Sequence, residues 1–342
     1  MSQRPILAIT MGDPAGIGPE VIVKALADPE PYTLCRPLVV GDARTIEAAA
    51  RTCGLALPVR AVEPHAVAGQ HGVVEVLDLH NVDLERFRRG VVSVEGGQAA
   101  YECVVRAVEL ALAGVAGGVV TAPLNKEALH LAGHRYPGHT ELLAHLCGVP
   151  DDEVTMLLAA PRLKVAHVSM HTSLRQAIEL VRPERIARVV RLAERALVQM
   201  GVARPRIAVA GLNPHAGESR LFGDEDADHI APTVAALRAE GLDVSGPLPP
   251  DTVFYRAYQG EFDVVVAMYH DQGHIPMKLV AFDEGVNVTL GLPIIRTSVD
   301  HGTAFDIAGT GKARADSMLA ALRLGAAMVA GAARLRREGG DS

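Results

Sequence analysis

The sequence predicts an α/β protein with mostly parallel sheets, and two observations carry this prediction. Short apolar runs of strand length alternate with longer runs of helical periodicity from one end of the chain to the other. The 342 residues, of which 49% are hydrophobic and 21% are charged, are enough for two domains that each bury a core. Strands that alternate with helices pack as α/β layers.

Each expected element follows from a local pattern. The buried-strand candidates are short apolar runs at 6–11, 38–40, 73–77, 118–121, 164–170, 206–211 and 262–268. The helix candidates have helical periodicity and lie at 20–27, 98–113, 183–200 and 224–240. The proline-rich segment from Gly246 to Asp251 predicts a rigid loop. A domain boundary is expected within residues 125–140, where a strand and a turn lead into a segment rich in His and Gly.

Composition argues against several classes of protein. The net charge of -7 comes from 40 acidic and 33 basic residues that are mixed along the chain, so no basic patch predicts a nucleic-acid partner. The chain shows neither the pattern of a secretory signal nor about 18 consecutive uncharged apolar residues, so we expect a cytoplasmic protein without a membrane span. The four cysteines are far apart and form no CxxC pair, which is typical of core or inert thiols.

Three histidines follow three expected strands. His171, His215 and His270 each come shortly after an apolar run. Loops at the carboxyl ends of parallel strands share one edge of a sheet, so the three imidazoles are expected to converge. Three imidazoles with an open fourth position form a catalytic zinc arrangement. Satisfied core or surface histidines are the alternative, because spacings of 44 and 55 residues match no short zinc motif.

Other polar residues suggest contacts around such a centre. Asp271 is adjacent to His270 and is expected to orient that ring or handle a proton. His274 is four residues after His270, and we interpret it as a substrate contact. His167 alternates with apolar neighbours, so it is expected to face the sheet and not to bind the metal.

A cluster of cationic and amide side chains predicts an anion site. Lys278, Asn287 and Arg296 surround the last apolar stretches, and the latter two lie within a mainly apolar segment. A charge in such a segment needs a partner, and a bound phosphate or carboxylate would provide one. The segment 309–313 is not a P-loop, because Asp306 occupies the first Gly position and Ala313 the Ser/Thr position. The glycines of 12–20 do not match GxGxxG either, so a nicotinamide cofactor must bind in another way.

Several long motifs resemble the 4-hydroxythreonine-4-phosphate dehydrogenase family. They run from residue 11 to about residue 311, and they cover 11–20, 138–141, 211–218, 269–273 and 285–302. The resemblance implies two α/β/α domains with a cleft between them, as in isocitrate and isopropylmalate dehydrogenases. We expect residues 1–130 with 300–342 to form the cofactor-side domain, and residues 131–299 to form the metal, substrate and dimerisation domain.

The resemblance also implies roles for individual residues. The metal ligands would be His171, His215 and His270, with zinc expected first and magnesium, cobalt or manganese as alternatives. The implied substrate contacts are His139, Thr140, Lys278, Asn287 and Arg296, and Asp251 is similar to the family residue that reaches across the homodimer. His274 is expected as a substrate contact from its position alone, since the family usually has small apolar residues in that segment. The implied NAD or NADP loop contains Asp300, His301, Gly302, Thr303, Asp306 and Gly309.

The implied reaction is a metal-dependent oxidation of a phosphorylated hydroxy acid, followed by loss of CO2 from the β-keto acid. The main hypothesis is 4-phospho-hydroxy-L-threonine, a precursor of pyridoxal phosphate. The segment 274–277 and the residues around His171 are also similar to a paralogous branch that oxidises 4-phosphorylated threonate or erythronate, which is the alternative. A dehydrogenase of aromatic cis-dihydrodiol carboxylates is less favoured, because it would have less use for the cluster of anion-binding residues. A metabolite-binding protein without activity is less favoured because the three histidines and the loop 300–309 are all present, and a dehydrogenase that needs no metal is a further alternative.

Overall fold

The computed structural model describes residues 4–84 and 86–340 and consists of two compact units. Unit 1 contains Met1–Val149 and Leu292–Arg334, and unit 2 contains Pro150–Gly291 and Leu335–Ser342. The first division between the units lies at residue 149, where we expected one near 130, and the second lies at residue 291, where we expected one at 299. The first difference arises because α5 (Lys126–Leu131) and α6 (His139–Leu146) pack against α4 (Val94–Leu112) of unit 1.

Unit 1 has a parallel sheet in the order β3-β4-β2-β1-β5-β12. Its strands are β1 (Ile6–Thr10), β2 (Arg36–Gly41), β3 (Val59–Ala61), β4 (Val74–Asp78), β5 (Gly118–Thr121) and β12 (Ile295–Val299). Further helices are α1 (Gly18–Ala27), α2 (Glu30–Leu34), α3 (Ala43–Thr52), α4 (Val94–Leu112), α12 (Asp316–Gly340) and the short η1 (Pro64–Ala66).

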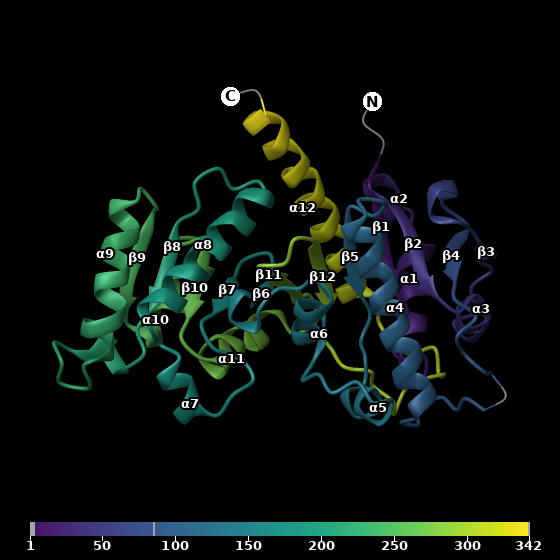
Figure 1. The fold of residues 1–342 in the computed structure, drawn as a ribbon, viewed down its shortest axis with the longest axis horizontal. Helices are drawn as coiled ribbons and strands as arrows, with labels where there is room; N and C mark the ends of the chain where they lie inside the picture. Colours follow the sequence, from purple (N-terminus) through teal and green to yellow (C-terminus); the bar gives the residue numbers. More distant parts are fainter. Residues whose placement is uncertain (1–3, 85, 341–342) are drawn as a thin grey trace. The chain divides into compact units, whose positions relative to one another are not determined.

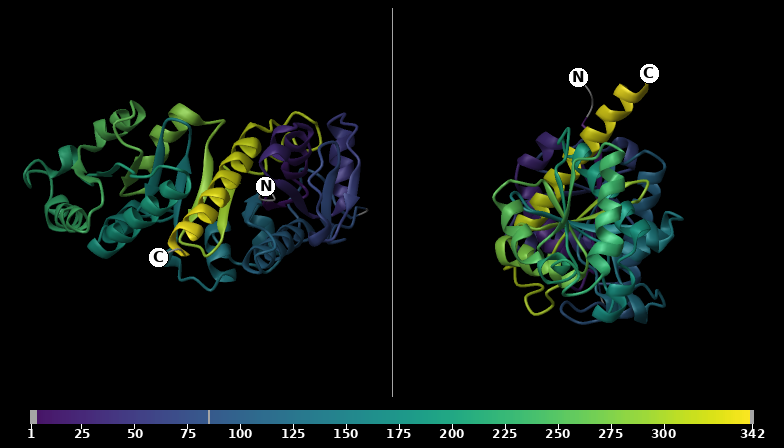
Figure 2. Two further views of the ribbon diagram at one scale, coloured as in Figure 1. Left: turned by 90° about the horizontal axis from the view of Figure 1, so that it is seen from above. Right: turned by 90° about the vertical axis from the view of Figure 1, so that its left-hand side faces the viewer.

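Helices cover both faces of this sheet because successive strand residues point to opposite sides. Ile6 and Ala8 of β1 belong to the core cluster that includes the apolar side of α4. On the opposite face, the Thr297 hydroxyl of β12 donates to the Ala321 carbonyl of α12 over 2.8 Å. The course of α12 is drawn in yellow in Figures 1 and 2.

Unit 2 has a mixed sheet in the order β11-β6-β7-β10-β8-β9, in which β6 is antiparallel to both neighbours. Its strands are β6 (Thr155–Ala159), β7 (Lys164–His167), β8 (Ile207–Ala210), β9 (Val244–Leu248), β10 (Val264–Ala267) and β11 (Val286–Leu290). Its α-helices are α7 (Leu174–Glu179), α8 (Pro183–Gln199), α9 (Ala231–Ala239), α10 (Pro250–Tyr258) and α11 (His270–Ala281). Shorter helices are η2 (Asp151–Glu153), η3 (Pro214–Gly217) and η4 (Asp226–Ile230). Side chains of α10 and α11 share a core with β6, β7, β8 and β10.

Every expected strand and helix is present, with ends that differ by a few residues. The expectation of a rigid loop over 246–251 is wrong, because β9 runs through Leu248 and α10 begins at Pro250. Proline is tolerated in β9 because β9 is an edge strand. It is tolerated at the start of α10 because the backbone N–H groups of the first helical turn have no partner within the helix. Cys35 and Cys103 are buried thiols, as expected for core cysteines, while Cys53 and Cys147 are half-buried.

One helix in the described part of the chain is long and apolar enough to cross a membrane by length and composition alone. It is α12, with a mean hydropathy of 1.4 over its most apolar window, of which 44% is buried within the protein. Gly325 lies so close to the unit 1 sheet that a Cβ there would meet the Thr297 hydroxyl at 3.0 Å. Contacts of this kind are typical of a core helix.

Candidate functional site

The structure places His171 and His270 next to each other in unit 2. They follow β7 and β10, which are parallel neighbours with Ala267 opposite His167. Because adjacent parallel strands end at one edge of the sheet, the loops that leave them lie together. The centroids of the His171 and His270 rings are 5.7 Å apart, and their planes are tilted by 46°.

Both imidazoles line a cavity of about 500 Å³ at this edge. The cavity is also lined by Met170, Thr172, Ser173, Leu174, Gln176, Ala177, Tyr269 and Asp271. Nδ1 of His270 lies 2.7 Å from a carboxylate oxygen of Asp271, which can only accept, so this nitrogen carries the hydrogen and donates to it. Nε2 of His270 is then the nitrogen with a lone pair for a ligand, as the expected orienting role of Asp271 requires.

A second pair of histidines supports His270 from behind. The His274 ring stacks on the His270 ring with centroids 3.6 Å apart and an angle of 12°. The His167 ring lies 4.8 Å from the His274 ring and is fully buried, and its Nδ1 approaches the Met156 carbonyl at 3.3 Å. Burial, together with the neighbouring His274, lowers the pKa of His167 to about 3, so this ring is neutral at pH 7. The expectation that His167 faces the sheet is confirmed.

His215 is not brought into this pair. It lies in η3 after β8, in a segment where His215, Ala216 and Glu218 all have positive φ. Its ring is 6.2 Å from the ring of Phe222. Within residues 4–84 and 86–340, no group of three or more His, Cys, Asp or Glu side chains is positioned to hold a metal ion.

The donor chemistry of the first pair suits a divalent cation. Two imidazoles whose rings are 5.7 Å apart can direct one nitrogen each toward a shared ion, since an N-to-zinc bond measures about 2.0–2.1 Å. The carboxylate on the far nitrogen of His270 is the partner that ligating histidines usually have. His171 and His270 therefore fit a cation, and a complete site needs at least one further donor.

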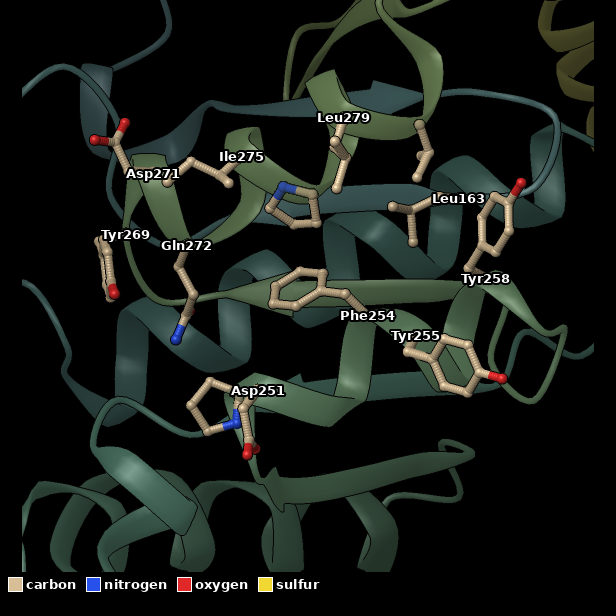
Figure 3. Close-up of a pocket in the computed structure, with 13 residues that line it drawn as sticks. Leu163, Asp251, Phe254, Tyr255, Tyr258, Tyr269, Asp271, Gln272, Ile275 and Leu279 are labelled. Carbon is tan, nitrogen blue, oxygen red and sulfur yellow. The ribbon is translucent and has the colours of Figure 1, made fainter.

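The remaining unit 2 residues of the expected site lie on three elements. Lys278 is in the last turn of α11, with Nζ 5.3 Å from the centre of the Phe282 ring. The Asn287 amide on β11 lies 2.9 Å from the Met156 sulfur. Asp251 is in the first turn of α10 and lines an apolar groove between α10 and α11. Figure 3 shows this groove with Asp251 and Asp271 at its polar rim.

Unit 1 contains the other expected anion-binding residues. The Arg296 side chain is 2% exposed, and its Nε and Nη2 donate to the Thr121 hydroxyl over 3.1 and 2.5 Å. Burial lowers the pKa of Arg296 to about 9, and the Glu141 carboxylate acts in the opposite direction. The pKa of His139 is well below its usual range because of burial and the nearby Arg296 and Lys126 charges. Thr140 is buried in the first turn of α6.

The expected cofactor residues occupy one irregular loop that follows β12. Asp300, His301 and Gly302 precede a series of turns from Phe305 to Gly311. The loop is fixed near its start, where the Ile17 N–H donates to the Thr303 carbonyl over 2.9 Å. It is fixed again at Gly309, whose N–H donates to the Glu20 carboxylate over 2.5 Å.

Sequence reasoning missed several residues that shape the site. Thr121 and Glu141 surround the buried Arg296, His167 supports His274, and Glu20 holds the loop after β12. The available signal was a polar residue at a strand end or in the first turn of a helix, which Thr121, Glu141 and Glu20 all show. No sequence pattern indicates which charge such a residue contacts.

The α/β layers, the histidines at strand ends and the buried arginine are typical of a metabolic enzyme. The family described as pyridoxal phosphate biosynthetic protein PdxA matches residues 33–325. A D-threonate 4-phosphate dehydrogenase of Cupriavidus necator is 52% identical over 94% of this chain and 96% of its own length. A 4-hydroxythreonine-4-phosphate dehydrogenase of Geobacter metallireducens is 49% identical over 99% of this chain and 98% of its own length.

Solved structures agree with these similarities. The crystal structure of a 4-hydroxythreonine-4-phosphate dehydrogenase from Burkholderia phymatum superposes with a TM-score of 0.84 at 50% identity, and covers 96% of this chain and 99% of that one. A terephthalate 1,2-cis-dihydrodiol dehydrogenase from Burkholderia xenovorans has a TM-score of 0.69 at 35% identity, over 94% of this chain and 98% of that one. The expected dehydrogenase fold is therefore confirmed, and the chain is an oxidoreductase. It belongs to the PdxA family of pyridoxal phosphate biosynthetic proteins.

Proposed function

We propose that this oxidoreductase catalyses the metal-dependent, NAD(P)-linked oxidation of a four-carbon hydroxy acid phosphorylated at C4, and that D-threonate 4-phosphate is its substrate. The observation that supports this choice of substrate is the stacking of His274 on His270. Relatives named for the sugar acid and for the amino acid match at 52% and 49% identity, so overall identity does not separate the two substrates.

The polarity of His274 provides the chemical argument. Its Nδ1 lies 3.1 Å from the His270 carbonyl, which can only accept, so Nδ1 carries the hydrogen and Nε2 of a neutral ring is an acceptor. An acceptor beside a cation ligand can take a hydrogen bond from the hydroxyl that a threonate presents next to the reacting carbinol. An amine at that atom would donate as well, so the kcat/KM values of the two substrates decide between them. The amino acid 4-phospho-hydroxy-L-threonine is the second candidate, favoured by the Geobacter metallireducens relative that matches nearly the full length.

Oxidation removes a proton from the substrate hydroxyl and a hydride from its carbon. A divalent cation at His171 and His270 would supply Lewis acidity that makes the hydroxyl easier to deprotonate and stabilises negative charge on its oxygen. NAD or NADP would supply the hydride acceptor. The resulting keto group is β to the carboxylate, so loss of CO2 follows readily. Asp271 holds the His270 ring in one tautomer and so fixes which nitrogen faces the reaction.

Arg296 is the proposed anchor for an anionic group of the substrate. A guanidinium that is removed from water binds phosphate or carboxylate more strongly than an exposed one, because little solvent competes for it. The Thr121 hydroxyl orients the guanidinium group of Arg296. Neutral His139 adds a hydrogen-bonding group without a second buried charge. Lys278, Asn287 and Thr140 are proposed as further contacts.

The experiment is NADH or NADPH formation by protein loaded with zinc, magnesium, manganese or cobalt. D-threonate 4-phosphate, its erythronate isomer and 4-phospho-hydroxy-L-threonine are compared at equal concentration. We expect kcat/KM to be highest for the threonate, and we expect His274→Leu to reduce that preference at least tenfold. A higher kcat/KM for the amino acid would overturn the choice of substrate, and activity with none of the three would overturn the proposed function.

We also propose a homodimer in which the groove between α10 and α11 is covered by a second copy. The groove is apolar, and its edges carry large exposed side chains: Leu279 is 83% exposed, Tyr255 68% and Ile275 66%. Patches of this kind on a folded protein usually mark an interface. Leu279→Glu is expected to shift the mass in sedimentation toward the monomer, whereas Leu221→Glu, at a leucine that is 71% exposed in a turn outside the groove, should not. A monomeric wild type would refute the proposal.

A further inference from the structure

The loop after β12 is held by two charged side chains of α1 that take no part in the proposed chemistry. Glu20 is 2% exposed, although it is a carboxylate in the first turn of its helix. Its two oxygens accept from the backbone N–H groups of Gly309 and Gly311, over 2.5 and 2.8 Å. A buried carboxylate needs such donors, and here both come from one loop.

Lys24 contacts the same loop from the next turn of α1. Its ammonium donates to the Gly311 carbonyl over 2.6 Å and to the Ala313 carbonyl over 2.7 Å. Residues four apart share one face of a helix, so Glu20 and Lys24 face the loop together. Two N–H groups and two carbonyls of the segment 309–313 are thereby bonded to ionised side chains.

The backbone of this segment has a conformation that needs such support. Gly309 and Gly311 have φ of +81° and +69°, a region that few residues other than glycine adopt. A Cβ on Gly311 would lie 2.9 Å from the Thr52 carbonyl oxygen, so the loop also approaches α3 closely. Glycine loses more conformational freedom on ordering than other residues, so an irregular segment with two glycines is costly to order without these bonds.

We propose that Glu20 and Lys24 are positioning residues that order the loop over 309–313 in advance for the nicotinamide dinucleotide. The inference rests on the proposed NAD(P)-linked function and on the expectation, implied by the family resemblance, that residues 300–309 contact the cofactor. A loop that is already ordered costs the dinucleotide less free energy on binding than a mobile one. The pair should therefore set the affinity for NAD(H) or NADP(H) and leave the affinity for the phosphorylated acid unchanged.

The test is direct titration of the dinucleotide, without turnover, by calorimetry and by NADH or NADPH fluorescence. Glu20→Gln keeps the shape but places an amide NH2 against a backbone N–H, and Lys24→Met removes both donors. Each variant is expected to weaken dinucleotide binding about 10- to 100-fold, the loss typical of a charge-assisted hydrogen bond. Lys24→Arg should recover part of the affinity. Glu47→Gln, on an exposed carboxylate of α3, is the matched control and should bind like the wild type.

The outcomes separate the two proposals. If the wild type binds neither NADH nor NADPH, the proposed function fails, and this inference fails with it. If the wild type binds one of them and a folded Lys24→Met binds it within twofold of the wild type, only the positioning role is refuted. Steady-state kinetics provide a second criterion, because the KM for the dinucleotide should rise while the KM for the acid is unchanged. If Glu20→Gln does not fold, Lys24→Met alone decides.

Discussion

Gly273 is the position where packing at the candidate site can be tested most directly. It lies in the first turns of α11, three residues after His270 and one before His274. A Cβ placed there would be 2.5 Å from Nε2 of His167 and 2.7 Å from a methyl group of Val165. Both neighbours are buried in the unit 2 core and cannot move into solvent.

Gly273→Ala must therefore displace α11 or the His167 ring. Opening the closest contact from 2.5 Å to an ordinary 3.4 Å needs a shift of about 0.9 Å. Overpacking of a core costs about 1–3 kcal/mol, and a shift of this size belongs to the upper half of that range, about 2–3 kcal/mol. The better helix propensity of alanine returns about 1 kcal/mol. We expect the free energy of unfolding to fall by about 1–2 kcal/mol, and the affinity for zinc or cobalt to fall with it, because His270 begins the same helix.

The double variant His167→Ala/Gly273→Ala isolates this contact. Removing the ring makes room for the new methyl group. The free energy of unfolding of the double variant should therefore fall by about 1–2 kcal/mol less than the sum of the losses in the two single variants. The assay is urea unfolding followed by circular dichroism, since the chain has no Trp to report by fluorescence. Gly302→Ala, where a Cβ meets nothing within 4 Å, is the control. A Gly273→Ala variant as stable as the wild type would refute the reasoning.

Three further predictions concern charge and metal. Arg296→Met should lower kcat/KM for the phosphorylated acid by about 10²–10³-fold, as steady-state kinetics would show, because the buried anchor is lost while the dinucleotide contacts are not. Burial raises the pKa of Asp13 from 3.8 to about 6. The contribution of this carboxyl group to the free energy of unfolding, about 3 kcal/mol, is therefore fully present below pH 3.8 and is lost as the pH rises through 6. Asp13→Asn should lack this loss when urea unfolding is compared at pH 4.5 and 7.5. Chelator treatment, or His171→Ala, should abolish NAD(P)H formation, because His171 is one of the two proposed cation ligands; full activity afterwards would exclude the metal-dependent reaction.

Much of the fold could be predicted because the central strands are continuous apolar runs. The run at 118–121 predicts β5 to the residue, and 6–11 predicts β1 to within one residue. The strands β3 and β9 were not predicted, since β3 is short and exposed and β9 contains Gly246 and Pro247. Helix α10 begins in the proline-rich segment and α11 contains Pro276, so their composition hides helices that tertiary packing stabilises.

The candidate site was less predictable than the fold, for a geometric reason. Strand ends indicate an edge of a sheet but not a distance, so they predict the pairing of His171 with His270 and cannot show how closely a third ring approaches. Asn287 and Arg296 are close in sequence, yet they lie on β11 of unit 2 and β12 of unit 1. Closeness in sequence therefore does not show that two residues belong to the same unit.

The anion site of unit 1 shows how a buried charge constrains its neighbours. Arg296 is a buried cation, and an adjacent imidazolium would add a second one at high cost, so burial and Arg296 together hold the pKa of His139 well below its usual range. His139 then acts through hydrogen bonding and not through charge. His139→Gln keeps a neutral polar group and should raise the KM for the phosphorylated acid less than tenfold between pH 6.5 and 8.5. His139→Lys, with its second buried charge, should lower the midpoint of urea unfolding. If His139→Gln raises the KM as much as Arg296→Met does, a charged His139 is required and this assignment is wrong.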